Sequence, residues 1–379
     1  MSKSYTSVLF NPLFFWFRLL GAYPPDNNFR VPYQICTFVA YLFINIINPL
    51  TIIIAAFKAE GAKEVIMLLP TLSGMITCNL KFINTFRNVE NLAVLQKRIL
   101  ELESQVDDYQ EEVYLIRKIR TVSRIIKFFV ANASFNIVIG TITVIISNDR
   151  GMFVSAWFPF EWKDSDTTYY LVVMGQALTT LLIVWQDCLN ESYPMIFCCA
   201  IVEHLHLLNM RFARIGHDSG KTKEENHRDL ISFIQYYESI VEIFTKLQDI
   251  IGIVYFIEIL TIEILLCTNA IYLTSTTNNF VEQLHVICFL IAIVCILGVS
   301  CYFGSELESE SQFLITAIYS CNWVDQSAEF KKDLITAMII SQKQIRLFAG
   351  RMVQMSLPTF LTVLKSTYSL VALLNNIKT

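Results

Sequence analysis

Long, uninterrupted apolar stretches are the feature of this sequence that most restricts its fold. A helix that crosses the hydrocarbon core of a bilayer needs about 20 apolar residues, and only helices or closed barrels satisfy their backbone groups there. The stretches lack the polar–apolar alternation of barrel strands, so they predict membrane-spanning helices. Seven such spans are predicted: Tyr33–Phe57, Val65–Phe86, Val122–Ile146, Tyr169–Val202, Ile250–Leu273, Val281–Phe303 and Gly350–Asn375.

Composition excludes several function classes. The 379 residues are 54% hydrophobic and 16% charged, against about 25% charged in a soluble domain. The net charge of −4 gives no indication of a nucleic-acid partner. The ten cysteines show no spacing typical of disulfide frameworks or zinc sites, and no P-loop, HExxH, nucleophile elbow or dinucleotide turn is present. We therefore expect an all-α membrane protein that is not an enzyme and that binds no metal and no cofactor.

The distribution of basic residues predicts the orientation. If the amino terminus is cytoplasmic, 22 of the 29 Lys and Arg residues fall in cytoplasmic segments and five in extracellular ones. Basic residues accumulate on the cytoplasmic side of membrane proteins. We predict seven transmembrane helices, a cytoplasmic N-terminus and an extracellular C-terminus, which is the reverse of a G-protein-coupled receptor.

Helical patterns also occur outside the spans. Val89–Arg120, Leu205–Asp249 and Phe330–Ile345 carry apolar residues at helical spacing; in the last of them, Leu334, Ile335, Met338, Ile339 and Gln342 lie on or near one face. Three independent solvated helices are one interpretation, but three apolar faces need partners, which favours a cytoplasmic helical anchor bundle. We expect the fourth and fifth spans to continue into this bundle as helices.

The segment before the first span has no signal-peptide pattern. Its apolar part, Val8–Leu20, is interrupted by Pro12 and Arg18. We expect an amphipathic segment on the membrane surface, with an interfacial cluster of Phe14, Phe15, Trp16 and Phe17.

The carboxyl-terminal part, Ser341–Leu374, contains an ordered series of short motifs: Ala349-Gly350, Ser356-Leu357, Thr359-Phe360, Val363-Leu364-Lys365, Tyr368-Ser369 and Leu373-Leu374. This series resembles the carboxyl-terminal signature of insect odorant receptors. The rest of the chain matches that family only in length, span count and topology. The short terminal motif usual in gustatory receptors of the same superfamily, Thr-Tyr-x-x-x-x-x-Gln-Phe, is absent.

The resemblance implies an odorant-sensing subunit of a ligand-gated, non-selective cation channel that passes monovalent cations and calcium. The implied partners are the odorant receptor co-receptor in a heterotetramer, a small volatile odorant and membrane lipid, in the plasma membrane of olfactory sensory neurons. The implied organisation is an amino-terminal cytoplasmic or interfacial segment (1–32), six spans with the odorant pocket and cytoplasmic helix extensions (33–303), an anchor segment (304–349) and a pore-lining seventh span (350–379).

Residues of the seventh span are candidates for the pore. Helical spacing places Lys365, Ser369, Leu373 and Asn376 along one stripe. The resemblance places the gate at Leu373 and Asn376, where Leu373 would form a hydrophobic constriction and Asn376 a polar mouth. Lys365 is costly in a span unless it faces water or a carboxylate, so we expect it to point to the inner vestibule or to a neighbouring subunit. The alternative is the ordinary end of a membrane helix.

Residues in the outer halves of the other spans are candidates for the pocket, whose apolar walls and few polar groups suit a small volatile. Helix packing is the alternative for each position. The candidates are Leu69, Ser73 and Ile76; Ile137, Gly140, Thr143 and Val144; Val173, Gln176, Ala177 and Thr180; Thr268 and Tyr272; and Phe289.

The remaining polar groups predict less. We expect the acids Asp187, Glu191, Glu258 and Glu263 to pair with basic residues of the anchor or to face water.

A secondary transporter, the alternative from another class, would have paired halves with discontinuous helices, and the sequence shows no internal repeat.

Overall fold

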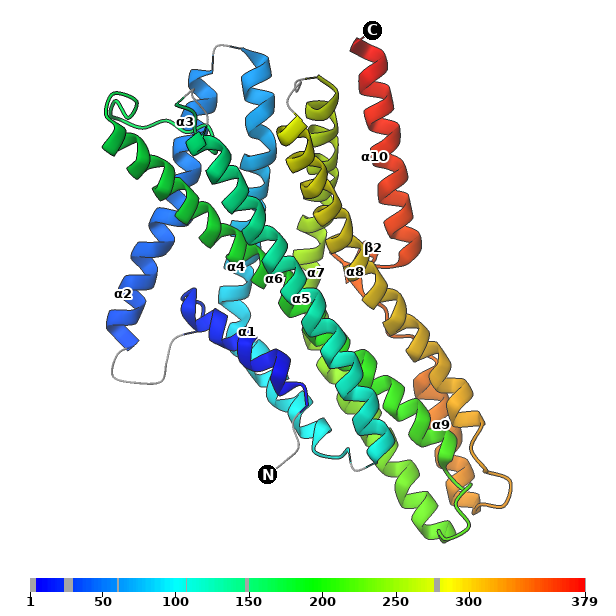
Figure 1. Ribbon diagram of the computed structural model, residues 1–379. Coiled ribbons are helices and arrows are strands. Elements are labelled where there is room, and N and C mark those ends of the chain that lie inside the picture. Colours follow the sequence, from blue (N-terminus) through cyan, green and yellow to red (C-terminus); the bar gives the residue numbers. More distant parts are fainter. Residues whose placement is uncertain are drawn as a thin grey trace.

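The computed structural model describes residues 5–23, 30–59, 61–106, 108–146, 150–275 and 280–378, which form an elongated bundle of long helices (Figure 1). A two-stranded antiparallel ribbon pairs Phe348 with Gln354. The elements are α1 (Ser7–Leu19), α2 (Arg30–Tyr41), η1 (Leu42–Ile47), α3 (Asn48–Lys58), α4 (Ala62–Glu103), α5 (Tyr109–Ile146), α6 (Asp166–Arg214), α7 (Lys223–Ser275), α8 (Phe280–Tyr319), α9 (Ala328–Ser341), β1 (Phe348–Ala349), β2 (Val353–Gln354) and α10 (Leu357–Lys378).

Each predicted span coincides largely with helix. Five stretches among the described residues are long and apolar enough to cross a membrane, and they cover the first, third, fourth, fifth and sixth predicted spans. The second span lies in α4, whereas the seventh coincides with α10 only from Leu357 onward, because the residues before it form a turn and the strand Val353–Gln354. The first span departs from a single α-helix, because η1 is a π-helical turn between α2 and α3. Pro49 follows this turn, and a proline has no N–H to donate to the carbonyl four residues back, which favours a locally widened helix.

The helices extend far beyond the thickness of a bilayer. α6 has 49 residues and α7 has 53. At about 1.5 Å per residue each is more than twice the roughly 30 Å of a hydrocarbon core. The expected continuation of the fourth and fifth spans as helices is therefore confirmed. We use the name lower bundle for the end of the molecule at the bottom of Figure 1. It consists of these extensions of α6 and α7, the carboxyl ends of α4 and α8, the amino end of α5, and all of α9.

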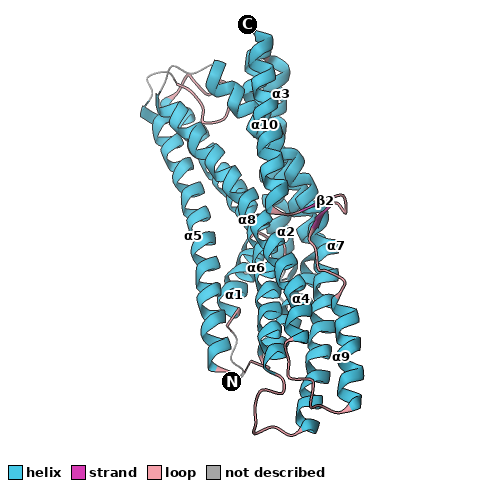
Figure 2. Cartoon of the chain, turned by 90° about the vertical axis from the view of Figure 1, so that its right-hand side faces the viewer, coloured by secondary structure: helices cyan, strands magenta, loops and turns pink. Residues whose placement is uncertain are grey.

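The lower bundle has the packed helices that the sequence predicts. α9 contacts α7 and α8 and lies at the opposite end of the molecule from the carboxyl end of α10 (Figure 2). Its buried face differs from the expected one, because Phe330, Leu334 and Ala337 are buried whereas Ile335 and Ile339 are exposed. Phe330 starts this face, and the Ser327 hydroxyl caps the helix by accepting a hydrogen bond from the Phe330 N–H.

Charged contacts tie the connection between α4 and α5 to the end of α6. Arg211 Nη2 lies 2.7 Å from Glu111 Oε2 in a largely buried ion pair, and Arg214 pairs with Asp108. The Gln110 N–H and the Arg214 guanidinium hold the pKa of Asp108 below its usual value. These contacts fix the turn at the base of α5 against α6.

The amino-terminal helix α1 is packed into the protein, which corrects one expectation. Phe14 and Phe17 are buried, so they are not interfacial residues, whereas Phe15 is 61% exposed. The Phe17 ring lies 6.1 Å from that of Tyr193 on α6. Burial of an aromatic ring in protein competes well with the membrane interface because it removes a large apolar area from water and fills the gap beside α6.

Replacing Phe17 tests whether α1 belongs to the folded core. We expect Phe17→Ala to destabilise the protein by about 3–5 kcal/mol, because it leaves a cavity against α6. Phe15→Ala, the matched control on the exposed face of the same helix, should leave stability almost unchanged. The apparent melting temperature of the purified protein in detergent measures both. Equal shifts for the two variants would contradict the packing of α1.

Candidate functional site

Three features bear on function: a region under the connection between α5 and α6, an ionic cluster between helices in the middle of the bundle, and α10, the candidate pore helix. The first contains a small apolar cluster, separate from the main core. Residues 150–165 cover it, with Ala156 buried and the Trp157 N–H donating to the Thr51 carbonyl at 3.0 Å. The buried members of the cluster are Ile52, Leu68, Met75, Cys78, Ala156 and Ile183.

The structure brings Gly140 of α5 and Gln176 of α6 against this covering segment. Val173 and Gln176 are buried on α6. The Gln176 side-chain N–H donates to the Val154 carbonyl at 2.8 Å, whereas its Oε1 is buried and has no hydrogen-bond partner within the described ranges. On α5, the Val144 carbonyl accepts a hydrogen bond from the Tyr169 hydroxyl at 3.2 Å.

Gly140 is a point of close contact between the covering segment and α5. A Cβ atom at this position would overlap the Phe153 ring, so the ring lies directly against the backbone of α5. Phe153 and Val154 lie between the third and fourth predicted spans, in a segment for which the sequence predicted no role. Its aromatic content, which includes Phe158 and Phe160, is the signal that could have placed it over an apolar surface.

The other predicted pocket residues differ in exposure, and several turn their polar groups to their own helix. Leu69, Ile76 and Phe289 are exposed, and Ile137 is buried. Ala177 and Thr180 are half-buried. The hydroxyls of three predicted residues donate to backbone carbonyls within their own helices: Ser73, Thr143 and Thr268. The side chain of Tyr272 lies outside the described part of the structure.

An ionic cluster joins three helices in the middle of the bundle. Lys81 of α4 is 4% exposed; it pairs with Glu191 of α6, and its Nζ lies 3.8 Å from Glu258 Oε2 of α7. These acids were expected to pair with basic residues of the anchor or to face water; Glu191 and Glu258 instead pair with Lys81 of the second predicted span. Lys81 is the one charged residue in its predicted span, and a charge can be buried there at tolerable cost only beside carboxylates.

Polar side chains extend this cluster along the same helices. Asn190, one residue before Glu191, is fully buried and accepts a hydrogen bond from the Thr85 hydroxyl at 3.2 Å. The Asn84 amide donates to the Ile250 carbonyl at 3.0 Å. α4, α6 and α7 are therefore held in register by polar contacts in a region where apolar packing alone would allow them to slide.

Removing the buried lysine tests this arrangement. Lys81→Met leaves two buried carboxylates without their cation, and we expect a loss of about 3–5 kcal/mol in stability. Lys81→Met combined with Glu191→Gln should recover part of it. Arg98→Gln is the control, because the exposed Arg98–Glu242 pair is worth about 0–1 kcal/mol. Equal falls in melting temperature for Lys81→Met and Arg98→Gln would refute a structural role for the cluster.

The carboxyl-terminal motifs fix the start of α10. Gly350 has φ +58°, and its N–H donates to the Gly252 carbonyl of α7 at 2.7 Å. Thr359 donates its hydroxyl proton to the Gln354 carbonyl at 2.7 Å, and the Leu357 N–H donates to the Ser305 hydroxyl of α8 at 2.9 Å. The first half of the signature thus anchors the helix to α7 and α8.

The described part of α10 leaves one face uncovered. Lys365, Tyr368 and Ser369 are exposed, whereas Val363 is buried against the bundle. Figure 1 shows α10 at the edge of the molecule, where it packs beside α7 and α8. Leu373 and Asn376 lie within the helix, but their side chains fall outside the described part of the structure.

His204 and His206 are two residues apart on α6, and their side chains point in different directions, as the helical spacing predicts. His204 hydrogen-bonds to the Tyr236 hydroxyl at 2.6 Å and His206 to Glu310 at 3.0 Å. Within the described ranges, no group of His, Cys, Asp or Glu side chains has the geometry of a metal site.

The fold and these features define a multi-pass helical membrane protein. The sequence model of the 7tm odorant receptor family matches residues 62–368, and the chain belongs to that family. The relatives that match this chain are odorant receptors rather than enzymes, as the sequence predicted. The family assignment also favours an odorant receptor over a gustatory receptor.

Individual relatives match almost the full length. Odorant receptor 33a of Drosophila melanogaster is 26% identical over 95% of this chain and 94% of its own, and odorant receptor 2a is 24% identical over 94% and 93%. The insect olfactory receptor OR5 from Machilis hrabei, solved in complex with eugenol, superposes with a TM-score of 0.83. It covers 98% of both chains at 15% identity, so this likeness concerns the fold.

Proposed function

We propose that this protein is an odorant-sensing subunit of a heteromeric ligand-gated cation channel. It assembles as a heterotetramer with the odorant receptor co-receptor in the plasma membrane of olfactory sensory neurons. It crosses the membrane seven times, with its amino terminus and the lower bundle in the cytoplasm. The family assignment and the uneven distribution of basic residues support this orientation.

The observation that carries the channel proposal is the uncovered face of α10. A membrane helix that packs on two neighbours at the edge of a chain, with Lys365, Tyr368 and Ser369 exposed, has room for other subunits or for water on that side. Leu373 and Asn376 lie further along this helix, at the spacing that continues the stripe. In the tetramer this face lines the pore for monovalent cations and calcium, and Leu373 forms the hydrophobic gate.

The ligand pocket of this proposal lies between the upper ends of α5 and α6. Gly140, Val144, Val173, Gln176 and Ala177 supply its walls beneath residues 152–154. Among the residues that the structure describes, Gln176 Oε1 has no hydrogen-bond partner, and an unpaired buried acceptor is costly. A small, mostly apolar volatile with one hydroxyl donor would satisfy it, and an isosteric ligand without the hydroxyl should bind more weakly.

Heterologous expression tests the channel function. Cells that express this chain with the co-receptor should give odorant-evoked cation currents to some members of a volatile panel, whereas cells with the co-receptor alone should not respond to them. A polar replacement, Leu373→Ser, should raise the current in the absence of odorant because it removes the dewetting barrier. A surface complex that conducts identically with and without the replacement would refute the pore role of α10.

A glycine pair tests the pocket. Gly140→Ala places a methyl group where Phe153 lies and forces the covering segment to move, so the concentration of odorant for half-maximal current should change by about tenfold or more, equivalent to a typical steric cost of 1–3 kcal/mol. Gly175→Ala is the matched control on α6, because a Cβ there meets nothing within 4 Å. An unchanged dose–response curve for Gly140→Ala would remove the α5–α6 region as the pocket.

A further inference from the structure

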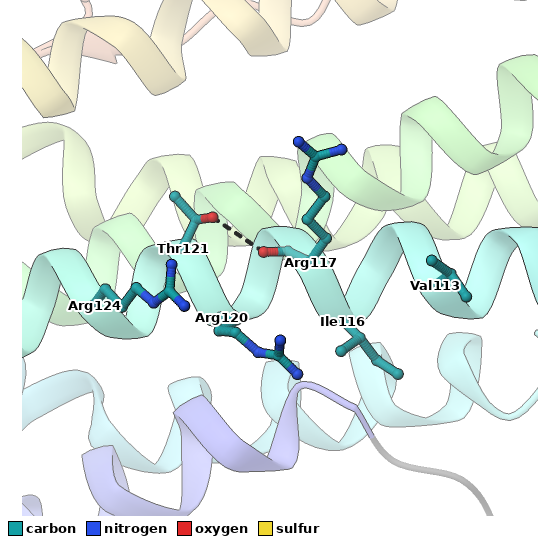
Figure 3. Close-up of a pocket in the computed structure, with 6 residues that line it drawn as sticks. All are labelled: Val113, Ile116, Arg117, Arg120, Thr121 and Arg124. Carbon is teal, nitrogen blue, oxygen red and sulfur yellow. Dashed lines mark hydrogen bonds between the residues drawn. The ribbon is translucent and has the colours of Figure 1, made fainter.

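Two adjoining cavities lie along α5 where its apolar part begins. The first, of about 490 Å³, is open and lined by one face of α5 (Figure 3). The second, of about 330 Å³, lies between α5, α6 and α8 and has mostly apolar walls. Arg117 and Thr121 line both cavities, which makes them two parts of one groove. None of the predicted odorant-pocket residues lines either part.

The first part of the groove carries an unneutralised positive charge. Arg117, Arg120 and Arg124 line it; Arg120 and Arg124 lie one helical turn apart, whereas the Arg117 guanidinium extends to the opposite side of α5 from that of Arg120 (Figure 3). They form no ion pair with any residue that the structure describes. Other arginines of the lower bundle do have carboxylate partners, as in the pairs of Arg98 with Glu242 and of Arg346 with Glu308. Arg120 and Arg124 thus present two unpaired guanidinium groups beside the cavity, which are suited to an anion with several oxygens.

The second part of the groove is suited to a hydrocarbon chain. Its walls include Val122 and Ile125, which continue from the arginines toward the apolar half of α5, and Val299 of α8. Two acids, Glu203 and Glu306, also line it, and Lys118 Nζ lies 3.9 Å from Glu203 Oε1. These carboxylates disfavour an anion in the second part, so the anion's place is the first.

We propose that the groove binds an anionic phospholipid of the cytoplasmic leaflet. Its phosphate oxygens contact Arg120 and Arg124, and one acyl chain lies along Val122 and Val299. The leaflet assignment rests on the orientation given under the proposed function, because it places these arginines at the level of cytoplasmic headgroups. The combination of a polybasic face and an apolar crevice distinguishes the site from general attraction of basic residues to an anionic surface.

Lipid binding by the purified full-length chain tests this inference independently of channel currents. The probe is dioleoylphosphatidylserine, added to the delipidated protein in neutral detergent, with retention measured by native mass spectrometry. We expect Arg120→Gln combined with Arg124→Gln to reduce retention about tenfold, since each basic residue near anionic lipid contributes substantially to binding. Lys97→Gln combined with Lys332→Gln removes the same charge from exposed helix surfaces outside the groove and should retain the lipid as the unaltered chain does.

Soluble probes separate the possible sources of the anion. Glycerophosphoserine, which has the headgroup without chains, and inorganic phosphate should each bind at least tenfold more weakly than the lipid. Equal binding of either one would overturn the lipid assignment in favour of a free anion. Equal losses in the two double variants would overturn the site itself, because diffuse surface charge would then explain retention. Absence of odorant currents in cells would leave this result unaffected and would count only against the channel proposal.

Discussion

The fold depends on α6, whose packing carries the rest of the chain. Its residues from Tyr193 to Leu208 are almost continuously buried, and α1, α4, α5, α7 and α8 all contact it. Because α6 is buried on every side in this stretch, with Glu203 and His204 enclosed among its apolar residues, it is surrounded by protein there. Its length of 49 residues then connects the membrane half to the lower bundle without a break. Displacement at one end of such a helix is therefore felt at the other.

The ionic cluster solves the problem that this packing creates. Long apolar helices in a lipid environment slide past each other at little cost, since lipid and leucine are similar solvents for an apolar side chain. Lys81, Glu191 and Glu258 each come from a different helix and meet at one level, so their electrostatic attraction fixes the relative heights of α4, α6 and α7. The upper region, where Gln176 and Gly140 lie, is built on helices whose register is set in this way.

The sequence predicted the helices better than it predicted which faces they bury. Long apolar stretches are constrained by the bilayer itself, so the spans and the continuation of α6 and α7 follow from composition and length. Phe17 and Ile335 were misplaced because burial depends on neighbours distant in sequence, here Tyr193 for the former. Lys81 had no predicted partner for the same reason. In the candidate pocket, the α5 and α6 residues were predicted together, but the covering segment with Phe153 has no periodic pattern to reveal its position.

The hydrogen bond from the Gly350 N–H to the Gly252 carbonyl gives α7 a second role. Gly252 lies fewer than two helical turns from Glu258, so the same stretch of α7 touches the ionic cluster and the loop that leads into α10. A small rotation of α7 about its own axis would therefore move both contacts together. It would change the distance between Glu258 and Lys81 and, at the same time, displace the loop that leads into α10.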